Sequence, residues 1–417
     1  MTKDVVELGR LKCKIRKTLR AHLAKVANVR WASDNQLLVS AGQDGKLVVW
    51  DTYTANKVRM IPLKTAWVLG CAMAPSTQFV VSGGLDNIIT LFSLKTPEGT
   101  PATMVRELAG HNGYISSLDY IDENHLLSAS GDKTIGLWDM ETMKLIATYK
   151  GHTNDVNAVR HCKVDRNLVV SVSSDFTCRI WDLRLRKCTQ LFEGHEQDVN
   201  GVDFFPSGHA FATSSDDLSC RLWDIRADQA VAAYVDDFIQ CGSTCVGFSH
   251  SGRLLIAGYD DFNCHIWDVL REERVGVLSA HDARVSSLSI NDSGNAIATG
   301  SWDSLCDGNR AVICCTRDGD RVVSELGADS PLRFLLACQA PFIVFAGTAA
   351  VRLLRCDQYV YSLQLRPLLI SPVFLWNVCF SYPPSPIFNN RSPIIFVEST
   401  FHSTCIVNRF LNSFYTT

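Results

Sequence analysis

The chain lacks several features that would assign it to a common functional class. Residues 1–20 are basic and polar and contain no apolar stretch of the kind found in a secretory signal peptide. The formal net charge is only −3, which gives no bias toward nucleic acid or anionic membranes. No phosphate-binding GxxxxGK(S/T) motif and no zinc-binding HExxH motif occurs. These absences argue against the common nucleotide-dependent and zinc-dependent enzymes and against a nucleic-acid partner.

Zinc-binding and disulfide patterns are also missing, although the chain has 16 cysteines. No two cysteines are spaced as CxxC, and the adjacent Cys314 and Cys315 have no histidine nearby, so we expect no metal site. Six cysteines lie in or near strand-like runs, and we interpret them as reduced, buried small side chains of a cytosolic protein. They are Cys13, Cys71, Cys162, Cys178, Cys220 and Cys264.

What the sequence does contain is an internal repeat. Six times an aspartate is followed six residues later by an aromatic residue, usually the tryptophan of a Trp-Asp pair. The pairs are Asp44/Trp50, Asp86/Phe92, Asp132/Trp138, Asp175/Trp181, Asp217/Trp223 and Asp261/Trp267. The aromatics recur about every 43 residues, within the period of about 40–45 that is typical of WD repeats. A seventh aspartate, Asp303, has Asn309 at the sixth position after it, so the repeat breaks off inside its last unit.

Each repeat contains four short strand-like segments separated by Gly, Asp and Asn turns. An alternating segment such as 285–290 comes first, and an apolar segment that ends in small residues, such as 126–130, follows it. The third segment ends on the aromatic residue, as in 178–181, and the fourth, as in 145–150, leads to the next histidine. Four short strands per unit are typical of propeller blades. The sequence therefore predicts an all-β propeller.

The polar residues of a repeat suit one buried, hydrogen-bonded chain. The turn aspartate can accept a hydrogen bond from the histidine, and the histidine can reach a hydroxyl on the middle strand, which in turn reaches the tryptophan N–H. Such a chain is stable only when every polar group in it has a partner. One repeat has His111, Ser128, Asp132 and Trp138 in these roles, and the next has His152, Ser171, Asp175 and Trp181.

A histidine, a serine and an aspartate also suggest the triad of a hydrolase. The set recurs in successive repeats, however, and one small domain has no need of several identical hydrolytic centres. We therefore interpret the set as structural, expect no enzyme, and assign no catalytic, cofactor-binding or metal-binding residue.

Residues 17–303 resemble the beta subunit of a heterotrimeric G protein more closely than a general WD-repeat protein. The resemblance rests on long matching runs as well as on the repeat itself. The runs are 18–25 (TLRAHLAK), 43–47 (QDGKL), 83–87 (GGLDN), 106–111 (RELAGH), 220–229 (CRLWDIRADQ), 251–255 (SGRLL) and 257–264 (AGYDDFNC). Because the family folds as a seven-bladed propeller, the resemblance implies that fold over residues 14–304, with an incomplete last blade.

The resemblance also implies a function. Members of the family are non-enzymatic scaffolds in transmembrane receptor signalling that bind a GDP-loaded alpha subunit, hold a gamma subunit and regulate effectors. It implies a cytoplasmic location at the inner face of the plasma membrane, reached through these partners.

In the family, one rim of the propeller contacts the alpha subunit and overlapping effectors. Matching positions place these residues on it here: Lys25, Lys46, Asn56, Lys57, Trp67, Leu69, Leu85, Asn87, Tyr114, Asp155, Asp198, Asp216 and Trp302. Trp67 and Trp302 would be rigid aromatic anchors, and the charged residues would set the orientation of the partner. The residues alone leave a second interpretation open, in which both tryptophans only pack within their blades. Ala27 and Asn157 stand where the family has a tyrosine and a methionine, and both changes remove contact area.

The start of the chain departs from the family pattern. The family begins with a long amphipathic helix that coils around the gamma subunit, whereas residues 1–13 offer at most one short apolar stripe ahead of the strand at 15–19. The alternative function is therefore a general WD-repeat adaptor that has lost gamma-subunit binding. Copurification with a gamma subunit would separate the two.

The end of the chain departs as well. After Ser304 the family pattern closes with a strand that ends on a tryptophan, whereas this chain continues as a divergent tail over 305–417. The nearest substitute for the closing strand is 311–315 (AVICC), which is displaced by several residues. A one-residue error in register exchanges the buried and exposed faces of a strand. We therefore expect an incomplete or poorly paired last blade, and disordered or loosely packed residues beyond about 316.

The tail leaves several origins open. It contains a proline-rich segment at 381–386 and two uncharged stretches, 334–351 and 367–390, each approaching the length of a membrane span. Prolines interrupt both stretches. Membrane insertion, a folded extra domain, and a segment derived from a splice variant or an erroneous gene model are the alternatives.

Overall fold

The computed structural model describes residues 8–9, 11, 13–95 and 102–303, and the backbones of six further strands between residues 309 and 398. All regular elements among these residues are strands. The chain divides into two compact units, Met1–Glu325 and Leu326–Thr417. The first unit contains seven four-stranded antiparallel sheets, which are the blades of a propeller.

The first three blades follow one another along the chain. Blade 1 consists of β2 (Val26–Trp31), β3 (Leu37–Gly42), β4 (Lys46–Asp51) and β5 (Asn56–Pro62). Blade 2 consists of β6 (Val68–Met73), β7 (Phe79–Gly84), β8 (Ile88–Ser93) and β9 (Thr103–Ala109). Blade 3 consists of β10 (Ile115–Tyr120), β11 (His125–Ser130), β12 (Thr134–Asp139) and β13 (Lys144–Lys150).

Blades 4 to 6 repeat the same order. Blade 4 consists of β14 (Val156–His161), β15 (Leu168–Ser173), β16 (Cys178–Asp182) and β17 (Lys187–Phe192). Blade 5 consists of β18 (Val199–Phe204), β19 (Ala210–Ser215), β20 (Cys220–Asp224) and β21 (Gln229–Tyr234). Blade 6 consists of β22 (Ser243–Phe248), β23 (Leu254–Tyr259), β24 (Asn263–Asp268) and β25 (Glu273–Ser279).

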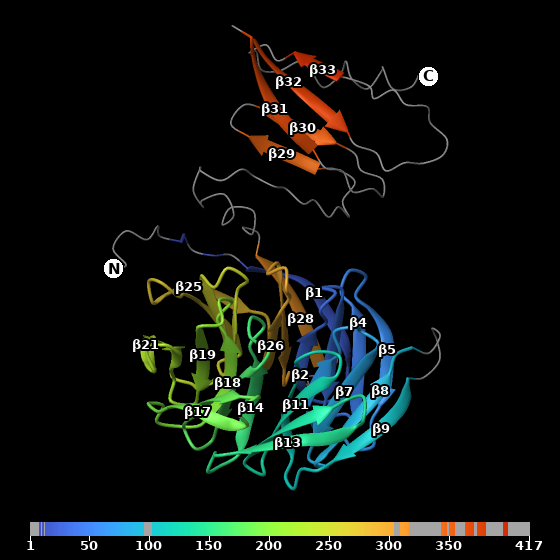
Figure 1. Cartoon of the computed structure of the whole chain (residues 1–417), viewed down its shortest axis with the longest axis vertical. Coiled ribbons are helices and arrows are strands. Elements are labelled where there is room, and N and C mark those ends of the chain that lie inside the picture. The colour runs from blue at the N-terminus through green and yellow to red at the C-terminus, as the bar shows by residue number, and fades with distance from the viewer. Residues whose placement is uncertain are drawn as a thin grey trace. The chain divides into compact units, whose positions relative to one another are not determined.

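The first strands of the blades surround a central channel. Each first strand contacts the first strand of the next blade, from β2 to β6 and onward, and β26 of blade 7 contacts β2 again, so the ring is closed. Figure 1 shows β2, β14, β18 and β26 toward the middle of the propeller and β9, β13, β17 and β21 at its periphery. Second strands are almost entirely buried, whereas fourth strands alternate between exposed and half-buried residues and have one buried residue near their end. This pattern places the core between neighbouring blades.

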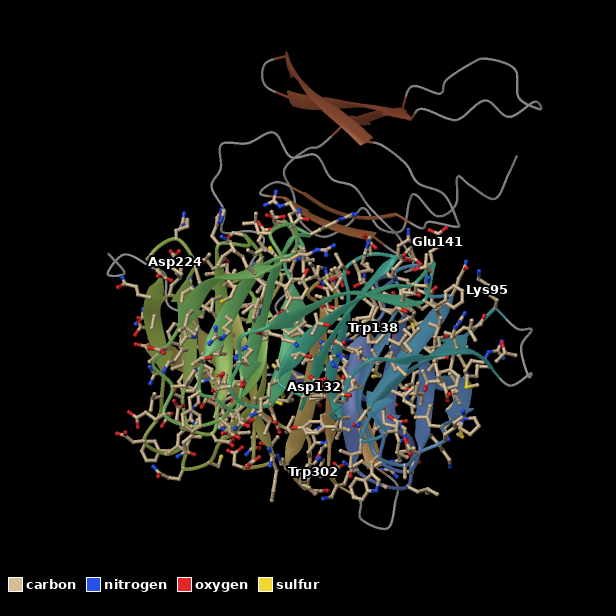
Figure 2. All side chains as sticks on the ribbon, turned by 60° about the horizontal axis from the view of Figure 1, so that its bottom comes forward. Lys95, Asp132, Trp138, Glu141, Asp224 and Trp302 are labelled. Carbon is tan, nitrogen blue, oxygen red and sulfur yellow. The ribbon has the colours of Figure 1, made fainter. Side chains whose placement is uncertain are left out.

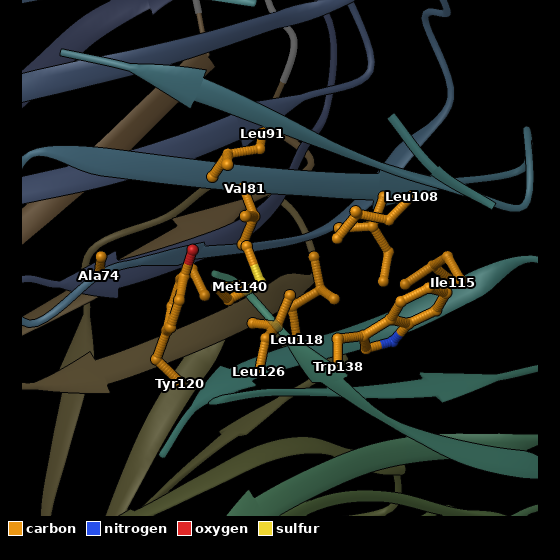
Figure 3. Close-up of a cluster of buried hydrophobic side chains, with 12 residues drawn as sticks. Ala74, Val81, Leu91, Leu108, Ile115, Leu118, Tyr120, Leu126, Trp138 and Met140 are labelled. Carbon is orange, nitrogen blue, oxygen red and sulfur yellow. The ribbon is translucent and has the colours of Figure 1, made fainter. Parts of the chain in front are cut away.

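Apolar side chains from adjacent blades interdigitate to form that core. Between blades 2 and 3, Val81 and Leu91 lie against Leu118 and Trp138, each at most 2% exposed (Figure 3). Fully burying a side chain of this size stabilises the fold by about 1.5–3 kcal/mol, so these clusters are a main source of stability.

A repeated turn explains the aspartate of the sequence motif. In six blades the residue directly after this aspartate has a positive φ, between 62° and 73°. Only two of the six, Gly45 and Asn87, are residue types that adopt this conformation readily. In blade 4, the carboxylate of Asp175 accepts a hydrogen bond from the Thr177 N–H at 3.0 Å and so closes the turn around Phe176.

Blade 7 combines strands from the start and the end of the propeller sequence. It consists of β26 (Val285–Ile290), β27 (Ala296–Ser301), β28 (Asn309–Thr316) and β1 (Cys13–His22), in the sheet order β1-β28-β27-β26. The expected gap at the third strand is therefore filled: the substitute segment 311–315 pairs with β27 on one side and β1 on the other. The first compact unit accordingly extends past the boundary expected at residue 304.

The pairing of β28 shows how this segment takes the place of the expected third strand. Cys314 pairs with Ile297, as Trp267 pairs with Leu255 in blade 6, so a cysteine stands at the register position of the repeat's tryptophan. Asp303 lies 11 residues before Cys314, whereas the other blades have a spacing of six. The apolar segment that pairs in register therefore comes later in the sequence than in the other blades. The β1–β28 ladder has two register shifts, whereas the β24–β25 ladder has one.

Hydrogen exchange should detect this closure. Because β28 lies between two strands, we expect the amides of 311–315 to exchange about as slowly as those of β16, the third strand of blade 4, in the full-length protein. Mass spectrometry of peptic fragments measures both segments in one experiment. Unprotected amides in 311–315 beside protected amides in β16 would contradict the pairing.

The second compact unit contains two small antiparallel sheets. One consists of β29 (Ile343–Gly347) and β30 (Ala350–Leu354), and the other of β31 (Leu363–Ile370), β32 (Val373–Phe380) and β33 (Ile395–Glu398). The proline-rich segment 381–386 and the other parts of the tail lie outside the described residues, so the expectation of disorder stays a prediction. No helix long and apolar enough to span a membrane occurs in the described part of the chain.

The burial of each cysteine in the propeller depends on the strand in which it lies. Of the six singled out in the sequence, Cys71, Cys162, Cys178, Cys220 and Cys264 are buried, whereas Cys13 is only half-buried because it lies on the outer strand β1. Burial raises the pKa of Cys71 to about 12, so its thiol stays protonated.

Candidate protein-binding rim of the propeller

The first strands of all seven blades begin at the same end of the propeller. In each blade, the residue directly before the first strand accepts a backbone hydrogen bond from the residue directly after the second strand, at 2.8–3.2 Å. The pairs are Lys25/Gln43, Trp67/Leu85, Tyr114/Gly131, Asp155/Ser174, Asp198/Asp216, Gly242/Asp260 and Arg284/Trp302. We call these fourteen residues the tryptophan rim. Because the bonds fix the backbone, the side chains on the rim start from equivalent positions around the ring.

Most of the predicted interface residues lie at this end. Eight belong to the tryptophan rim: Lys25, Trp67, Leu85, Tyr114, Asp155, Asp198, Asp216 and Trp302. Lys46 and Asn87 lie at the turn between the second and third strands of their blades, at the same end, and Leu69 is the second residue of β6.

Two predicted residues lie elsewhere. Asn56 and Lys57 begin β5, where Asn56 pairs with Asp51 at the finish of β4. They therefore lie at the opposite end of blade 1, because the third strands run away from the tryptophan rim. In Figure 2, Trp302 is at the lower edge, while Asp224 and Glu141, which end or follow third strands, lie toward the opposite edge. Sequence matching could not separate the two ends of one blade.

Two exposed apolar side chains occupy the blade 2 part of the rim. Trp67 is 56% exposed and Leu85 is 50% exposed, and the two residues are joined by the Leu85 N–H to Trp67 carbonyl bond at 3.0 Å. The exposure of Trp67 excludes a role limited to packing within its blade. An exposed aromatic side chain on a fixed backbone is the type of group that anchors protein interfaces.

Trp302 is half-buried and held between two cations. The Lys25 Nζ lies 3.9 Å from the centroid of its ring, and the Arg284 guanidinium lies 4.9 Å from it. Cation–π contacts of this kind contribute about 0.5–1 kcal/mol each at exposed sites. The ring of Trp302 is therefore positioned before any partner arrives.

Hydrogen bonds between blades order the acidic part of the rim. The Tyr114 hydroxyl donates to Asp155 at 2.9 Å, and the Ser174 hydroxyl donates to Asp198 at 2.8 Å. Burial and then the hydrogen bond to Asp155 raise the pKa of Tyr114 to about 12, so the phenol remains a donor. The carboxylates are thus fixed in place.

Charge is distributed unequally around the tryptophan rim. Lys25 and Arg284, beside Trp302, carry positive charge, whereas blades 4 to 6 present Asp155, Asp198 and Asp216, and Asp260 pairs with Arg284 at 2.9 Å. A rim with apolar anchors between a cationic and an acidic sector can orient a partner of complementary charge.

Below the rim, a buried polar chain ties successive blades together. In blade 4, His152 bonds through Nδ1 to Asp175 at 2.9 Å and through Nε2 to the Ser171 hydroxyl at 2.7 Å, and that hydroxyl accepts the Trp181 indole N–H at 2.8 Å. Blade 3 has the predicted chain of His111, Asp132, Ser128 and Trp138, with distances of 2.7–2.8 Å. Blades 1 and 5 contain the same arrangement.

The geometry of this hydrogen-bonded set of side chains indicates a structural role. Ser128 and Ser171 are fully buried, and each hydroxyl already accepts an indole N–H. A nucleophile must instead reach substrate. Each histidine follows the fourth strand of one blade and bonds into the next blade, so the chain joins neighbouring blades.

Comparison with known proteins identifies the family. The family model described as "G protein beta WD-40 repeat protein" matches residues 1–308. One relative, the "Guanine nucleotide-binding protein G(I)/G(S)/G(T) subunit beta-1" of Homarus americanus, is 53% identical over 298 residues, which are 72% of this chain and 87% of the relative. The chain belongs to the G protein beta WD-40 repeat family. The resemblance inferred from the sequence runs is thereby confirmed.

Several rim residues of this family member were not predicted. Arg284, Asp260 and Ser174 lie on the tryptophan rim. Arg284 contacts Trp302 and pairs with Asp260, and Ser174 bonds to the predicted residue Asp198. These residues can be identified by position, because each lies directly before the first strand or directly after the second strand of its blade. This identification requires strand boundaries, which the sequence gives only roughly.

The two positions that differ from the expected family residues have different surroundings. Asn157, in β14, donates to the Ser174 hydroxyl at 3.0 Å and to the Val199 carbonyl at 2.9 Å, so it links blades 4 and 5. Ala27 is the second residue of β2 and is half-buried. Asn157 thus has a structural role at a position where contact area was expected to be lost.

Three blades of this G protein beta family member lack part of the polar chain. In blade 2, Thr65 bonds to Asp86 at 3.2 Å in place of a histidine. In blade 6, His265 bonds to Asp261 from within β24, at 2.8 Å. In blade 7, His281 bonds to Asp303 and to Thr299, both at 2.8 Å, but Cys314 stands at the tryptophan position.

Acid should weaken the propeller through the turn aspartates. Burial raises the pKa of Asp175, but the hydrogen bonds from His152, Thr177 and the Thr153 amide outweigh burial and hold this pKa well below its usual range. A depressed pKa contributes stability that is complete above the unfolded value of about 3.9 and is lost as the pH falls below it. We therefore expect the urea midpoint of Asp175→Asn to fall less than that of the wild type between about pH 6 and pH 3. Equal pH dependence of the two midpoints would contradict the assignment.

No cluster of histidine, cysteine and carboxylate side chains suited to a metal occurs in the described part of the chain.

Proposed function

We propose that this protein is a G-protein beta subunit that acts as a signalling scaffold, and that its tryptophan rim binds a GDP-loaded alpha subunit. Membership of the family and the relative named as a G(I)/G(S)/G(T) subunit beta-1 support a signalling scaffold. The observation that carries the proposal is the gathering of eight expected interface residues on one rim, with Trp67 exposed and Trp302 held in place.

The mechanism uses the rim as a surface that two kinds of partner share. Trp67, Leu85 and Trp302 offer apolar contact, and the cationic and acidic sectors fix the orientation of the alpha subunit. Nucleotide exchange reshapes the alpha subunit and weakens this contact. The freed rim then binds effectors, which accounts for scaffolding without catalysis by the propeller itself.

Location follows from the same partners. We propose that the protein works in the cytoplasm at the inner face of the plasma membrane, held there by the alpha subunit and, where it binds one, by a gamma subunit.

Binding to an alpha subunit tests the proposal directly. The full chain, produced alone and together with a gamma subunit, is titrated against an alpha subunit of the G(I) class by calorimetry. We expect saturable binding to the GDP-loaded form and at least tenfold weaker binding to the form loaded with a non-hydrolysable GTP analogue. Absence of binding to the GDP form by both preparations would overturn the proposal.

A further inference from the structure

A cavity lies at the opposite end of the propeller channel from the tryptophan rim. Its volume is about 430 Å³, and its lining comes from the ends of the first strands of six blades, β2, β10, β14, β18, β22 and β26, and the turns that follow them. Cavities of about 300–1,000 Å³ hold small ligands in proteins. The volume therefore admits an organic molecule.

Ionisable side chains line this cavity from six blades. They are Arg30 of blade 1, Asp119 of blade 3, Arg160, His161 and Lys163 of blade 4, Asp203 of blade 5, His250 of blade 6 and Asp292 of blade 7. Their charges act on one another: Arg160, Asp119 and Asp203 all influence the pKa of Arg30. These residues are far apart in the sequence, so only closure of the ring brings them together.

The carboxylates in the cavity have partners of their own. Asp119 bonds to the His161 ring at 2.7 Å and to the His161 backbone N–H at 3.0 Å. Asp203 accepts the Phe248 backbone N–H at 3.0 Å. Burial outweighs the charge of Arg160 and raises the pKa of Asp203.

Two residues that line the cavity each have a buried donor without a partner. The guanidinium Nε of Arg30 and the indole Nε1 of Trp31 are buried and have no hydrogen-bond partner among the described residues. Buried donors are nearly always paired in native proteins, because an unpaired one loses its bonds to water. Burial, and next the charge of Arg160, lower the pKa of Arg30 to about 10, so the guanidinium still carries its charge at neutral pH.

From the cavity and the arginines that line it, we infer that the far end of the channel binds a small phosphate monoester. Arg30 and Arg160 bind the phosphate, because a guanidinium presents paired N–H donors that match phosphate oxygens. The cavity exceeds the volume of phosphate alone, so the remaining part of the ligand fills it. This site lies apart from the tryptophan rim and goes beyond the proposed function.

Calorimetric titration of the full chain with ribose 5-phosphate and with inorganic phosphate, at constant ionic strength, tests the inference. We expect saturable binding of ribose 5-phosphate with a Kd below about 1 mM and weaker binding of inorganic phosphate. Tighter binding of inorganic phosphate would overturn the assignment of an organic ester. Absence of saturation by both up to about 10 mM would overturn the site itself.

Variants locate the binding. Arg30→Gln should raise the Kd at least tenfold. Arg30→Lys keeps the charge but loses the planar donor pair, so its Kd should lie between those of the wild type and Arg30→Gln. Asp203→Asn should lower the Kd several-fold because it removes an opposing charge. Circular dichroism and the melting temperature check the fold of each variant.

Arg226→Gln is the matched control, because Arg226 is exposed and pairs with Asp224 away from the channel. Its Kd should equal that of the wild type. Equal affinity of Arg30→Gln and the wild type, or weaker binding by Asp203→Asn, would contradict the inference.

Discussion

Replacing Trp302 with alanine is expected to weaken binding of the GDP-loaded alpha subunit by about 2 kcal/mol or more, which is roughly a 30-fold increase in Kd. The reason is that Trp302 is a pre-positioned aromatic group, with Lys25 at 3.9 Å and Arg284 at 4.9 Å from its ring. Its removal deletes the anchor and frees both cations to move. Calorimetry of the variant against the same alpha subunit measures the loss.

A matched control separates the rim from general surface effects. Tyr53 is 59% exposed and lies in the turn between β4 and β5, at the opposite end of blade 1. Tyr53→Ala should bind the alpha subunit as the wild type does. Both variants should keep the circular dichroism of the propeller, and unchanged affinity of Trp302→Ala would remove the interface assignment.

Asp175→Ala is expected to lower the free energy of unfolding by about 1–3 kcal/mol. The substitution removes the acceptor for the His152 Nδ1 at 2.9 Å and for the Thr153 and Thr177 backbone N–H groups at 2.9 and 3.0 Å. The part-buried donors of His152 and Thr177 would be left without this partner, and the turn around Phe176 would lose the bond that closes it. Urea denaturation followed by tryptophan fluorescence gives the change in midpoint.

The control for this variant removes a carboxylate that does not hold a turn. Glu193 is exposed and follows β17 in the same blade, so Glu193→Ala should leave the midpoint nearly unchanged. A midpoint for Asp175→Ala equal to that of the wild type would overturn the structural role of the chain. The fold of the propeller should persist in both variants.

The blades could be read from the sequence because their signals are local. Asp175 and Trp181 are six residues apart, and both belong to one turn and the strand that follows it. The sequence predicted less completely which residues lie together on the tryptophan rim. Trp67 and Trp302 lie where matching positions put them, but Asn56 and Lys57 lie at the opposite end of blade 1, and Arg284 was missed. A repeat pattern gives the order of strands but not the end of the sheet at which each residue lies.

By itself, the sequence determined the repeated strand order, the buried histidine chains and the membership of the family. Each of these depends on residues close together in the chain or on direct matches to relatives. Only the tertiary structure decided how blade 7 closes, because β28 must pair with β1, about 300 residues away in the sequence. It alone also decided that Arg30, Arg160 and Asp203 share one cavity. Those residues come from blades 1, 4 and 5, and no local pattern relates them, since their proximity arises from the curvature of the closed ring.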